Sequence, residues 1–382
     1  MLLKVRASIK KPNEICQLTT AHSLDDERIL HRMAISAEEM GYGGAVAGCA
    51  DESSQYGNVP LIAARKKRKR GLIPNRFTAW LSVTRWALAS PFGVFQIHDP
   101  DLIPGGLILR MCGRKVIYDV HDDYQKNIET RLPRLLYLNV LVALMWWIFE
   151  KTSSRFFNGI IVADRHLEGK FRPLKSIVLG NFPNMDFTGE SNTRGEKTFN
   201  LLYVGGVNWQ RGIRVSLEAL RLIKNDEIRF HIVGTCRDQA LLEELQTEPR
   251  IILHGQIPWE KLSSFYEKAH LGLALYQPLP CFIYCPGENA VKVLEYMAAG
   301  IPVVTSNFPG LSKFIGDGNF GCVVDPTDPA AIAKQISRLH QDTELRQALG
   351  RNGRQLFESD FNWEVHEPKL ANFYAIVVGG RN

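Results

Sequence analysis

Short apolar runs alternate with amphipathic stretches along most of the chain. The runs are rich in Val, Ile and Leu, which is typical of strands buried in parallel sheets, and the stretches between them have helical spacing. In the first half the predicted strands are Ile15–Thr20, Val94–His98, Lys115–His121, Gly159–Ala163 and Ser176–Gly180. In the second half they are Phe199–Val204, Arg229–Gly234, Ile251–Gly255, Leu271–Tyr276 and Val303–Thr305. This alternation predicts an α/β protein with two doubly wound, Rossmann-like sheets.

Chain length sets the expected number of domains. A chain of 382 residues is too long for one ordinary hydrophobic core. The stretch 188–198 is polar, charged and poor in apolar residues, so it is the predicted linker. We therefore expect an N-terminal domain over 1–187, a C-terminal domain over 199–362, and a final helix over 363–382 that crosses back to the N-terminal domain.

The segment Cys285–Gly310 carries the first candidate chemistry. It predicts a turn, a helix over Glu288–Ala299 and a short strand. On such a helix Glu288, Lys292 and Glu295 have i, i+4, i+7 spacing and share a face. The helix N-terminus and a lysine suit a phosphate, and a carboxylate can accept hydrogen bonds from a ribose diol. The same spacing also fits a solvated helix face with an ion pair.

This segment resembles the donor-binding signature of retaining glycosyltransferases of the GT-B fold, specifically glycosyltransferase family 4. In that family a Glu, seven residues and a second Glu precede an Ala-rich helix end and Gly-x-Pro-Val. Glu295 matches the second Glu, and Tyr296–Val303 match the helix end and the Gly-x-Pro-Val sequence. Gly287 stands where the first Glu is expected, and Glu288 is one residue later. The resemblance implies that Glu295 binds the ribose; whether Glu288 replaces the first Glu is open.

A glycine-rich turn provides the second part of the expected donor site. The strand Phe199–Val204 runs into a Gly-Gly turn and then a helix, an arrangement whose backbone amides can bind a diphosphate. Where family 4 enzymes often carry Arg and Lys, this chain has Gly206 and Arg211, so Lys292 is expected to supply the second cation. The predicted donor-binding residues are Gly205, Gly206, Arg211, Gly287, Asn289, Lys292 and Glu295.

His and Asp residues cluster at the ends of two N-terminal strands. Ligands of open parallel sheets bind beyond the carboxyl ends of the strands, where these residues are expected. The resemblance implies that His121 lies beside the anomeric carbon of the donor, so His121 and Glu288 are the catalytic candidates. The predicted acceptor or cleft residues are His22, Arg28, His98 and Asp99. For a lone His or Arg, a purely structural role stays an alternative.

Composition narrows the class of protein further. The contents of 45% hydrophobic and 23% charged residues are those of a globular protein. Seven cysteines without a CxxC pair predict a reducing compartment. The first 20 residues lack the apolar run of a signal sequence, so we expect a cytoplasmic protein. No Asp-x-Asp pair lies in a suitable loop, so neither a metal nor a cofactor is expected, and Arg211 and Lys292 are expected to carry the diphosphate charge.

Two further segments point to a surface partner. Arg65–Arg70 reads RKKRKR, and Leu135–Phe149 is apolar but shorter than the roughly 20 residues needed to cross a bilayer. Together they predict docking on an anionic membrane. The alternative is a helix buried under the sheet with a solvated basic loop. Nucleic-acid binding is not expected, because the basic residues are confined to one loop.

The resemblance implies a retaining glycosyltransferase that moves a sugar from a nucleotide diphosphate sugar to an acceptor hydroxyl. We expect a lipid-linked acceptor glycan in surface polysaccharide biosynthesis, and a peripheral position on the inner face of the plasma membrane. The missing first Glu and Arg motivate one alternative, a catalytically weak nucleotide-sugar-binding subunit of a membrane-associated glycan assembly complex.

Overall fold

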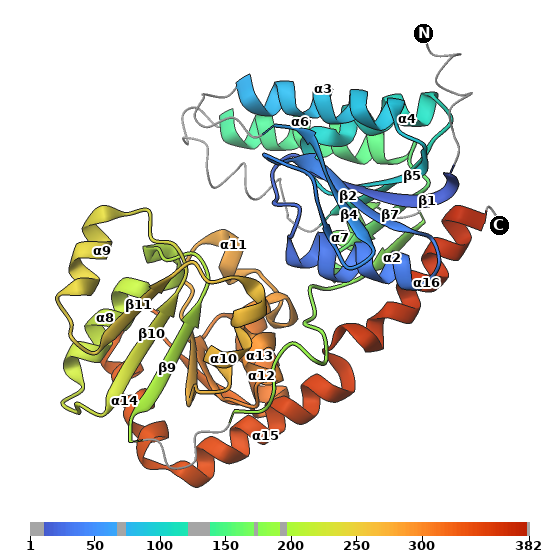
Figure 1. Ribbon diagram of the computed structural model, residues 1–382. Helices are drawn as coiled ribbons and strands as arrows, with labels where there is room; N and C mark the ends of the chain where they lie inside the picture. The colour runs from blue at the N-terminus through green and yellow to red at the C-terminus, as the bar shows by residue number, and fades with distance from the viewer. Residues whose placement is uncertain (1–10, 67–73, 121–137, 172–174, 192–196, 380–382) are drawn as a thin grey trace. The chain divides into compact units, whose positions relative to one another are not determined.

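The computed structural model describes residues 11–66, 74–120, 138–171, 175–191 and 197–379. The chain divides into two compact units (Figure 1). The first unit combines Met1–Asn181 with His366–Asn382, and the second unit is Phe182–Val365. Both are α/β units, as the alternation of apolar runs and helical stretches predicts.

The sheet of the first unit has the strand order β3-β4-β2-β1-β5-β6-β7-β8 across the part of the chain that is described. Neighbouring strands are parallel except β3 and β4, which form an antiparallel hairpin. The strands are β1 (Lys11–Leu18), β2 (Gly44–Cys49), β3 (Ser54–Tyr56), β4 (Val59–Arg65), β5 (Phe92–Ile97), β6 (Lys115–Val120), β7 (Gly159–Val162) and β8 (Ser176–Val178).

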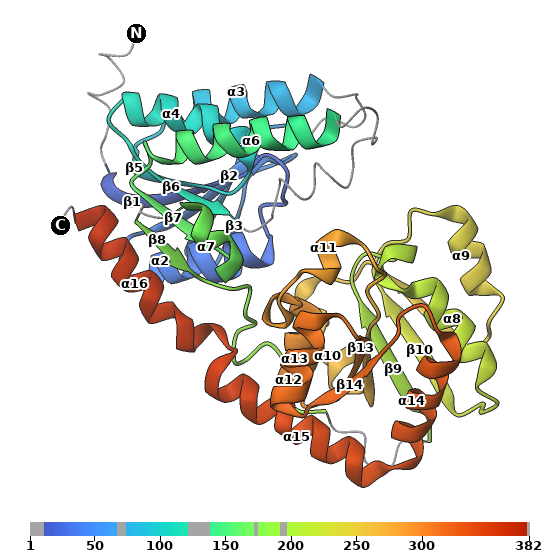
Figure 2. The same cartoon turned by 180° about the vertical axis from the view of Figure 1, so that it is seen from behind.

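Helices cover both faces of this sheet (Figure 2). One face carries α3 (Pro74–Ala89), α4 (Ile103–Met111) and α6 (Leu138–Ser154), and α7 (Arg165–Phe171) packs against α6. The other face carries a π-helical stretch over Glu27–Ala34, α2 (Ile35–Glu39) and the later part of α16 (Trp363–Gly379). From His366 onward α16 belongs to the first unit, where the Tyr374 hydroxyl donates to Gln96 Oε1 at 2.7 Å.

The second unit contains a parallel sheet with the strand order β11-β10-β9-β12-β13-β14. Its strands are β9 (Phe199–Val204), β10 (Ile228–Val233), β11 (Ile251–Gly255), β12 (Leu271–Ala274), β13 (Val303–Ser306) and β14 (Gly321–Val324). Its helices are α8 (Ile213–Leu222), α9 (Gln239–Gln246), α10 (Ser263–Tyr266), α11 (Pro280–Ile283), α12 (Val291–Ala298), α13 (Pro309–Gly318), α14 (Pro329–Gln341) and α15 (Thr343–Asp360). The prediction of two Rossmann-like sheets is therefore confirmed.

A linker between the domains was expected over 188–198, but the structure divides the two units at another position. Thr188 is buried, the Ser191 amide donates to Ala299 O at 2.8 Å, and its hydroxyl donates to Ala269 O at 2.6 Å. The Ser191 amide and hydroxyl satisfy backbone carbonyls of the second unit, so the described part of the stretch packs on that unit. The division between the units falls at Asn181 and Phe182 instead.

The strands that were not predicted include the hairpin β3–β4 and the strand β14. Among the described helices, none is long and apolar enough to cross a membrane.

Candidate functional site

Lys292 of α12 reaches the glycine turn at the end of β9. Gly205 has φ +133°, and a Cβ atom built on it would lie 2.4 Å from Lys292 Nζ. The ammonium also lies 5.5 Å from the ring centroid of Tyr203, the side chain one residue before the end of β9. Tyr203 fixes the turn, because its hydroxyl donates to Gly206 O at 2.7 Å. A glycine is required at position 205 both for the backbone conformation and for the close approach of the lysine.

Arg211 lies at the same edge of the sheet. It ends a 3-10 turn over Trp209–Arg211, where the Asn208 side chain accepts from the Arg211 amide at 3.1 Å. Its guanidinium lies 5.4 Å from the ring centroid of Tyr276 and 4.9 Å from that of Phe282. These aromatic faces hold a cation through their ring quadrupoles, and a guanidinium has several N–H donors with which it can bind an anion.

Lys292 and Arg211 both lie near Tyr203. Burial raises the pKa of Tyr203, and the nearby Arg211 charge opposes that rise. Burial likewise raises the pKa of Tyr276 to about 12, again against the Arg211 charge. Both phenols therefore stay neutral at physiological pH. Because β9 and β12 are adjacent parallel strands, Lys292 and Arg211 both lie at the carboxyl edge of the sheet.

Glu295 has a hydrogen-bond partner that was not among the predicted site residues. It lies one turn after Lys292 on α12 and is 9% exposed. The hydroxyl of Tyr266, at the end of α10, donates to Glu295 Oε2 at 2.6 Å. A buried phenol donor fixes the orientation of the carboxylate, whose two oxygens together can accept several hydrogen bonds. No sequence spacing links the two residues, which are 29 positions apart.

The predicted helix over Glu288–Ala299 is wrong at its start. Gly287–Asn289 form a separate 3-10 turn after Pro286, and Ala290 has φ −79° and ψ 80°, which interrupts the helix. The α-helix begins only at Val291. Glu288 therefore does not share a helical face with Lys292 and Glu295, and the i, i+4, i+7 argument holds only for the last two.

The position of the missing first Glu is closed to side chains. A Cβ on Gly287 would lie 2.4 Å from Phe314 Cβ and 2.7 Å from Gly310 O, both on α13. The amides of Asn289 and Ala290 donate to Pro286 O (3.0 Å) and Gly287 O (3.1 Å). The amide of Asn289, a predicted donor-binding residue, therefore already donates a hydrogen bond within the turn.

In the first unit, Arg28 and Asp119 form a buried ion pair. The guanidinium donates to Asp119 through Nε at 3.1 and 3.2 Å and through Nη2 at 2.8 Å. Its Nη1 donates to Leu179 O at 3.1 Å and to Asn181 Oδ1 at 2.6 Å. Burial raises the pKa of Asp119, but the charges of Arg28 and His98 outweigh it and hold this pKa well below its usual range. Arg28 thus connects β6 to the segment after β8 that contains Leu179 and Asn181.

His98 belongs to the same network and is fully buried. Its Nδ1 lies 3.3 Å from Asp119 Oδ2, and its Nε2 lies 2.8 Å from Gln17 Oε1. Gln96 Nε2 also donates to Asp119 Oδ2, at 3.1 Å. The network fixes the carboxyl ends of β1, β5 and β6, so Arg28 and His98 are placed to position the loops after these strands rather than to touch a ligand.

Asp99 organises the loop after β1. Its Oδ2 accepts from the Thr19 hydroxyl at 2.7 Å and from the Thr20 amide at 2.6 Å. Burial raises the pKa of Asp99, but these hydrogen bonds and the charge of His22 lower it below its usual value. His22 Nε2 lies 3.6 Å from Asp99 Oδ1. Of the four predicted cleft residues, only His22 is partly exposed, with 30% of its side chain accessible.

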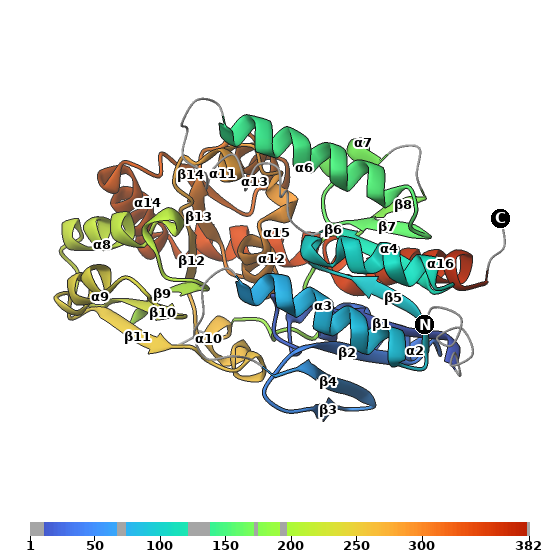
Figure 3. The same ribbon diagram turned by 90° about the horizontal axis from the view of Figure 1, so that it is seen from above.

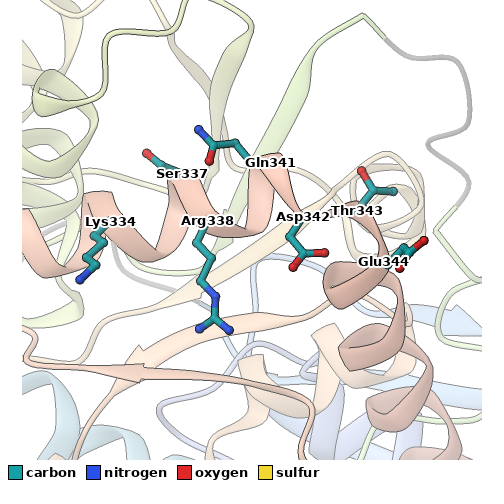
Figure 4. A pocket seen from close by; sticks show the side chains of 7 residues that line it. All are labelled: Lys334, Ser337, Arg338, Gln341, Asp342, Thr343 and Glu344. Atoms are coloured by element: carbon teal, nitrogen blue, oxygen red, sulfur yellow. The ribbon is translucent and has the colours of Figure 1, made fainter.

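The predicted catalytic residue His121 lies outside the described residues, directly after β6. One open groove of about 800 Å³ lies elsewhere, where α14 meets α15. Its walls include Lys334, Arg338, Asp342 and Glu344 (Figure 4). None of the predicted donor-binding residues lines it.

Comparisons with known proteins give the class. Residues 185–356 match the family described as "Glycosyl transferases group 1". The match covers most of the second unit and supports the resemblance drawn from Glu295 and the residues after it.

The relatives and solved structures agree with this assignment. The chain is 25% identical over 207 residues to the Staphylococcus aureus protein named capsular polysaccharide biosynthesis glycosyltransferase CapM, covering 49% of this chain and 50% of that protein. The chain spans about half the length of the first curated relatives that it matches.

Two solved structures extend the likeness to both units. Sucrose-phosphate synthase from Thermosynechococcus elongatus shares the fold with TM-score 0.75 and 17% identity, over 97% of this chain and 100% of that one. Anabaena HepE, solved with UDP and glucose, gives TM-score 0.67 and 15% identity over 94% and 98% of the two chains. These neighbours have the GT-B fold, so the predicted fold class is confirmed.

Proposed function

We propose that this protein is a glycosyltransferase that takes its sugar from a nucleotide diphosphate sugar. One observation carries the proposal: Lys292 lies against the Gly205 turn while Glu295, one turn further along the same helix, is held by Tyr266. A cation at a glycine turn and a carboxylate one helical turn away match the two polar parts of a nucleotide, the diphosphate and the ribose. The family match of this unit supports the same conclusion.

In the proposed complex, the Gly205–Gly206 turn contacts the diphosphate through its backbone, and Lys292 and Arg211 neutralise its charge. Glu295 accepts hydrogen bonds from the ribose diol. When the bond between the sugar and the diphosphate breaks, negative charge grows on the leaving oxygen, and preorganised cations stabilise it. Each such group contributes roughly 3 to 4 kcal/mol in comparable sites.

The catalytic role on the first unit is proposed for His121, at the reacting carbon of the donor. The buried pair Arg28–Asp119 supports this role, because Asp119 is two residues before His121 and its carboxylate is held by four polar side-chain atoms of Arg28, Gln96 and His98. On the resemblance to family 4, transfer retains the anomeric configuration and needs neither a metal nor a cofactor.

For the acceptor we propose a glycan hydroxyl, on a lipid-linked intermediate of surface polysaccharide biosynthesis. The similarity to a protein named for capsular polysaccharide biosynthesis supports this class of acceptor. A lipid-linked acceptor also implies a peripheral position on the cytoplasmic face of the plasma membrane.

A second candidate function rests on Gly287. Because Phe314 and Gly310 O fill the space where a side chain at 287 would stand, the donor sugar loses the contact that the family's first Glu provides. Glu288, in the separate 3-10 turn, is the nearby carboxylate that can replace it. If it does not, the protein is a nucleotide-sugar-binding subunit with weak catalysis.

The test is a thermal-shift screen of nucleotide diphosphate sugars, followed by a turnover assay with the donor that raises Tm most. A ligand that binds only the folded state raises Tm by mass action. At a ligand concentration a hundredfold above Kd, the free energy of unfolding rises by about 2.7 kcal/mol. Stabilisation with donor hydrolysis or transfer supports the enzyme. Stabilisation without turnover supports the binding subunit. No stabilisation by any nucleotide sugar contradicts both.

A further inference from the structure

Helix α6 of the first unit presents an apolar face to solvent. Its side chains have i, i+4, i+8 spacing in two adjacent rows, and each is 38% to 62% exposed. The exposed residues of this α6 face are Val140, Leu141, Leu144, Met145, Ile148 and Phe149. Six large apolar side chains on one helix form a contiguous patch, whereas scattered single ones are ordinary on protein surfaces.

The opposite side of α6 is fixed to the rest of the unit, so the exposure is not a consequence of a loose helix. Ala143, Glu150 and Ser154 are buried there. The Glu150 carboxylate accepts from the Tyr118 hydroxyl of β6 at 2.7 Å and pairs with Lys170 of α7. This anchoring determines which face points outward. It also buries the only acidic residue in the sequence of this helix, so the α6 face carries no negative charge.

Basic residues flank the α6 face. Lys151 Nζ lies 4.7 Å from the ring centroid of Trp147, and Arg155 is exposed directly after the helix. Arg65 ends β4 and Lys66 follows it, ahead of α3, and α3 and α6 lie over the same face of the sheet (Figure 1, Figure 2 and Figure 3). Apolar side chains beside lysine, arginine and tryptophan are the combination that interfacial helices use.

We propose that the α6 face docks on an anionic lipid membrane, with the helix lying in the plane of the interface. The apolar side chains enter the headgroup region, and the basic residues contact lipid phosphates. A symmetric contact with a second copy also covers an apolar face, but it gives no role to the basic residues around it. The docking surface stands on α6 and its neighbours; its purpose, to bring the enzyme to a lipid-linked acceptor, rests on the proposed function.

Cosedimentation of the full chain with vesicles tests the proposal. We compare pure phosphatidylcholine with a mixture containing about 30 mol% phosphatidylglycerol, at low and at physiological salt. The wild-type protein should pellet with the anionic vesicles only, and binding should fall as salt rises. Protein that stays in the supernatant at every lipid composition and salt overturns the proposal without any variant.

Variants locate the surface. Leu144→Glu with Ile148→Glu, and the milder Met145→Glu alone, should each reduce vesicle binding, the double change by at least about tenfold. The matched control is Leu222→Glu on α8 of the second unit, which is 55% exposed and should leave vesicle binding unchanged. Equal loss in the control, or no loss in either α6 variant, contradicts the assignment. A wild-type dimer that these variants dissociate, without vesicle binding, assigns the face to a second copy instead.

Donor binding separates this proposal from the proposed function. In lipid-free buffer the α6 variants should bind nucleotide sugar as the wild type does, because the α6 face and the donor residues belong to different units. Loss of vesicle binding with intact donor binding supports the docking surface and shows that the variants leave the donor site undisturbed. A wild type that binds vesicles but no nucleotide sugar leaves the docking surface standing and overturns the function.

Discussion

The Tyr266 hydroxyl donates a 2.6 Å hydrogen bond to Glu295 Oε2. Tyr266 is fully buried, and its ring packs against those of Phe187 and Tyr296 at centroid distances of 5.2 and 5.9 Å. The phenol therefore cannot move away from the carboxylate without disturbing the core of the second unit. A buried carboxylate held in one orientation is suited to a ligand hydroxyl pair, and it explains why Glu295 is kept at 9% exposure on α12.

Arg211 and Lys292 should act together on the donor diphosphate. Single changes to Ala should each lower turnover, and the double change should lower it by less than the product of the two, because both charges serve one anion. A double-mutant cycle in kcat/KM measures this coupling. Strict additivity would place one of the two cations away from the diphosphate.

Gly205→Ala should weaken donor binding through Lys292. The new methyl group meets Lys292 Nζ at 2.4 Å, and the φ of +133° is unfavourable for alanine, so turn and lysine must both shift. Gly206→Ala is the control, since its nearest neighbour, Asn208 Nδ2, lies 3.8 Å away. Donor affinity should fall at least about tenfold for Gly205→Ala and much less for Gly206→Ala. Equal effects would show that the approach of Lys292 does not matter.

His121→Ala should lower turnover far more than donor affinity, because its proposed role is at the reacting carbon. Comparing kcat with the donor Kd from calorimetry separates the two effects. Equal losses in both would indicate a donor-binding or folding role. Full activity would mean that His121 has no part in catalysis.

The Arg28–Asp119 pair should make stability depend on pH. The pKa of Asp119 is lowered in the folded state, chiefly by Arg28 acting against the effect of burial, so the folded protein holds the carboxylate more strongly than the unfolded chain does. This contribution is fully present above the unfolded pKa of about 3.9 and is lost as pH falls below it. Asp119→Asn should cost about 3 to 5 kcal/mol at pH 7.

Urea unfolding from pH 7 to pH 3 measures this dependence. The difference between wild type and Asp119→Asn should shrink as pH falls, because the wild-type carboxylate gains its proton only when the protein unfolds. A difference that is the same at pH 7 and pH 3 would mean that the charge of Asp119 does not stabilise the fold.

The sheets were predictable because most of their strands read as continuous apolar runs; the predicted bounds of β9 and β11 match the structure. The break before α12 was not, because Glu288–Ala299 has good helical spacing and only the conformation of Ala290 interrupts it. The pairing of Tyr266 with Glu295 depends on tertiary packing, which no local pattern records. His98 looked like a ligand contact because it ends a strand, yet the Asp119 network buries it.

Calorimetric titration of nucleotide diphosphate sugar into wild type and three variants tests the central claim most directly. Glu295→Ala removes the acceptor of the ribose diol, worth about 1.5 to 3 kcal/mol, so the donor Kd should rise roughly tenfold to a hundredfold. Tyr266→Phe, which only frees the carboxylate, should raise Kd several-fold. In the control Tyr296→Phe, which loses bonds from its hydroxyl to Leu202 O and Leu273 O, Tm should fall while Kd stays unchanged. A Glu295→Ala protein that binds donor as tightly as the wild type, with only its Tm lowered, would contradict the account.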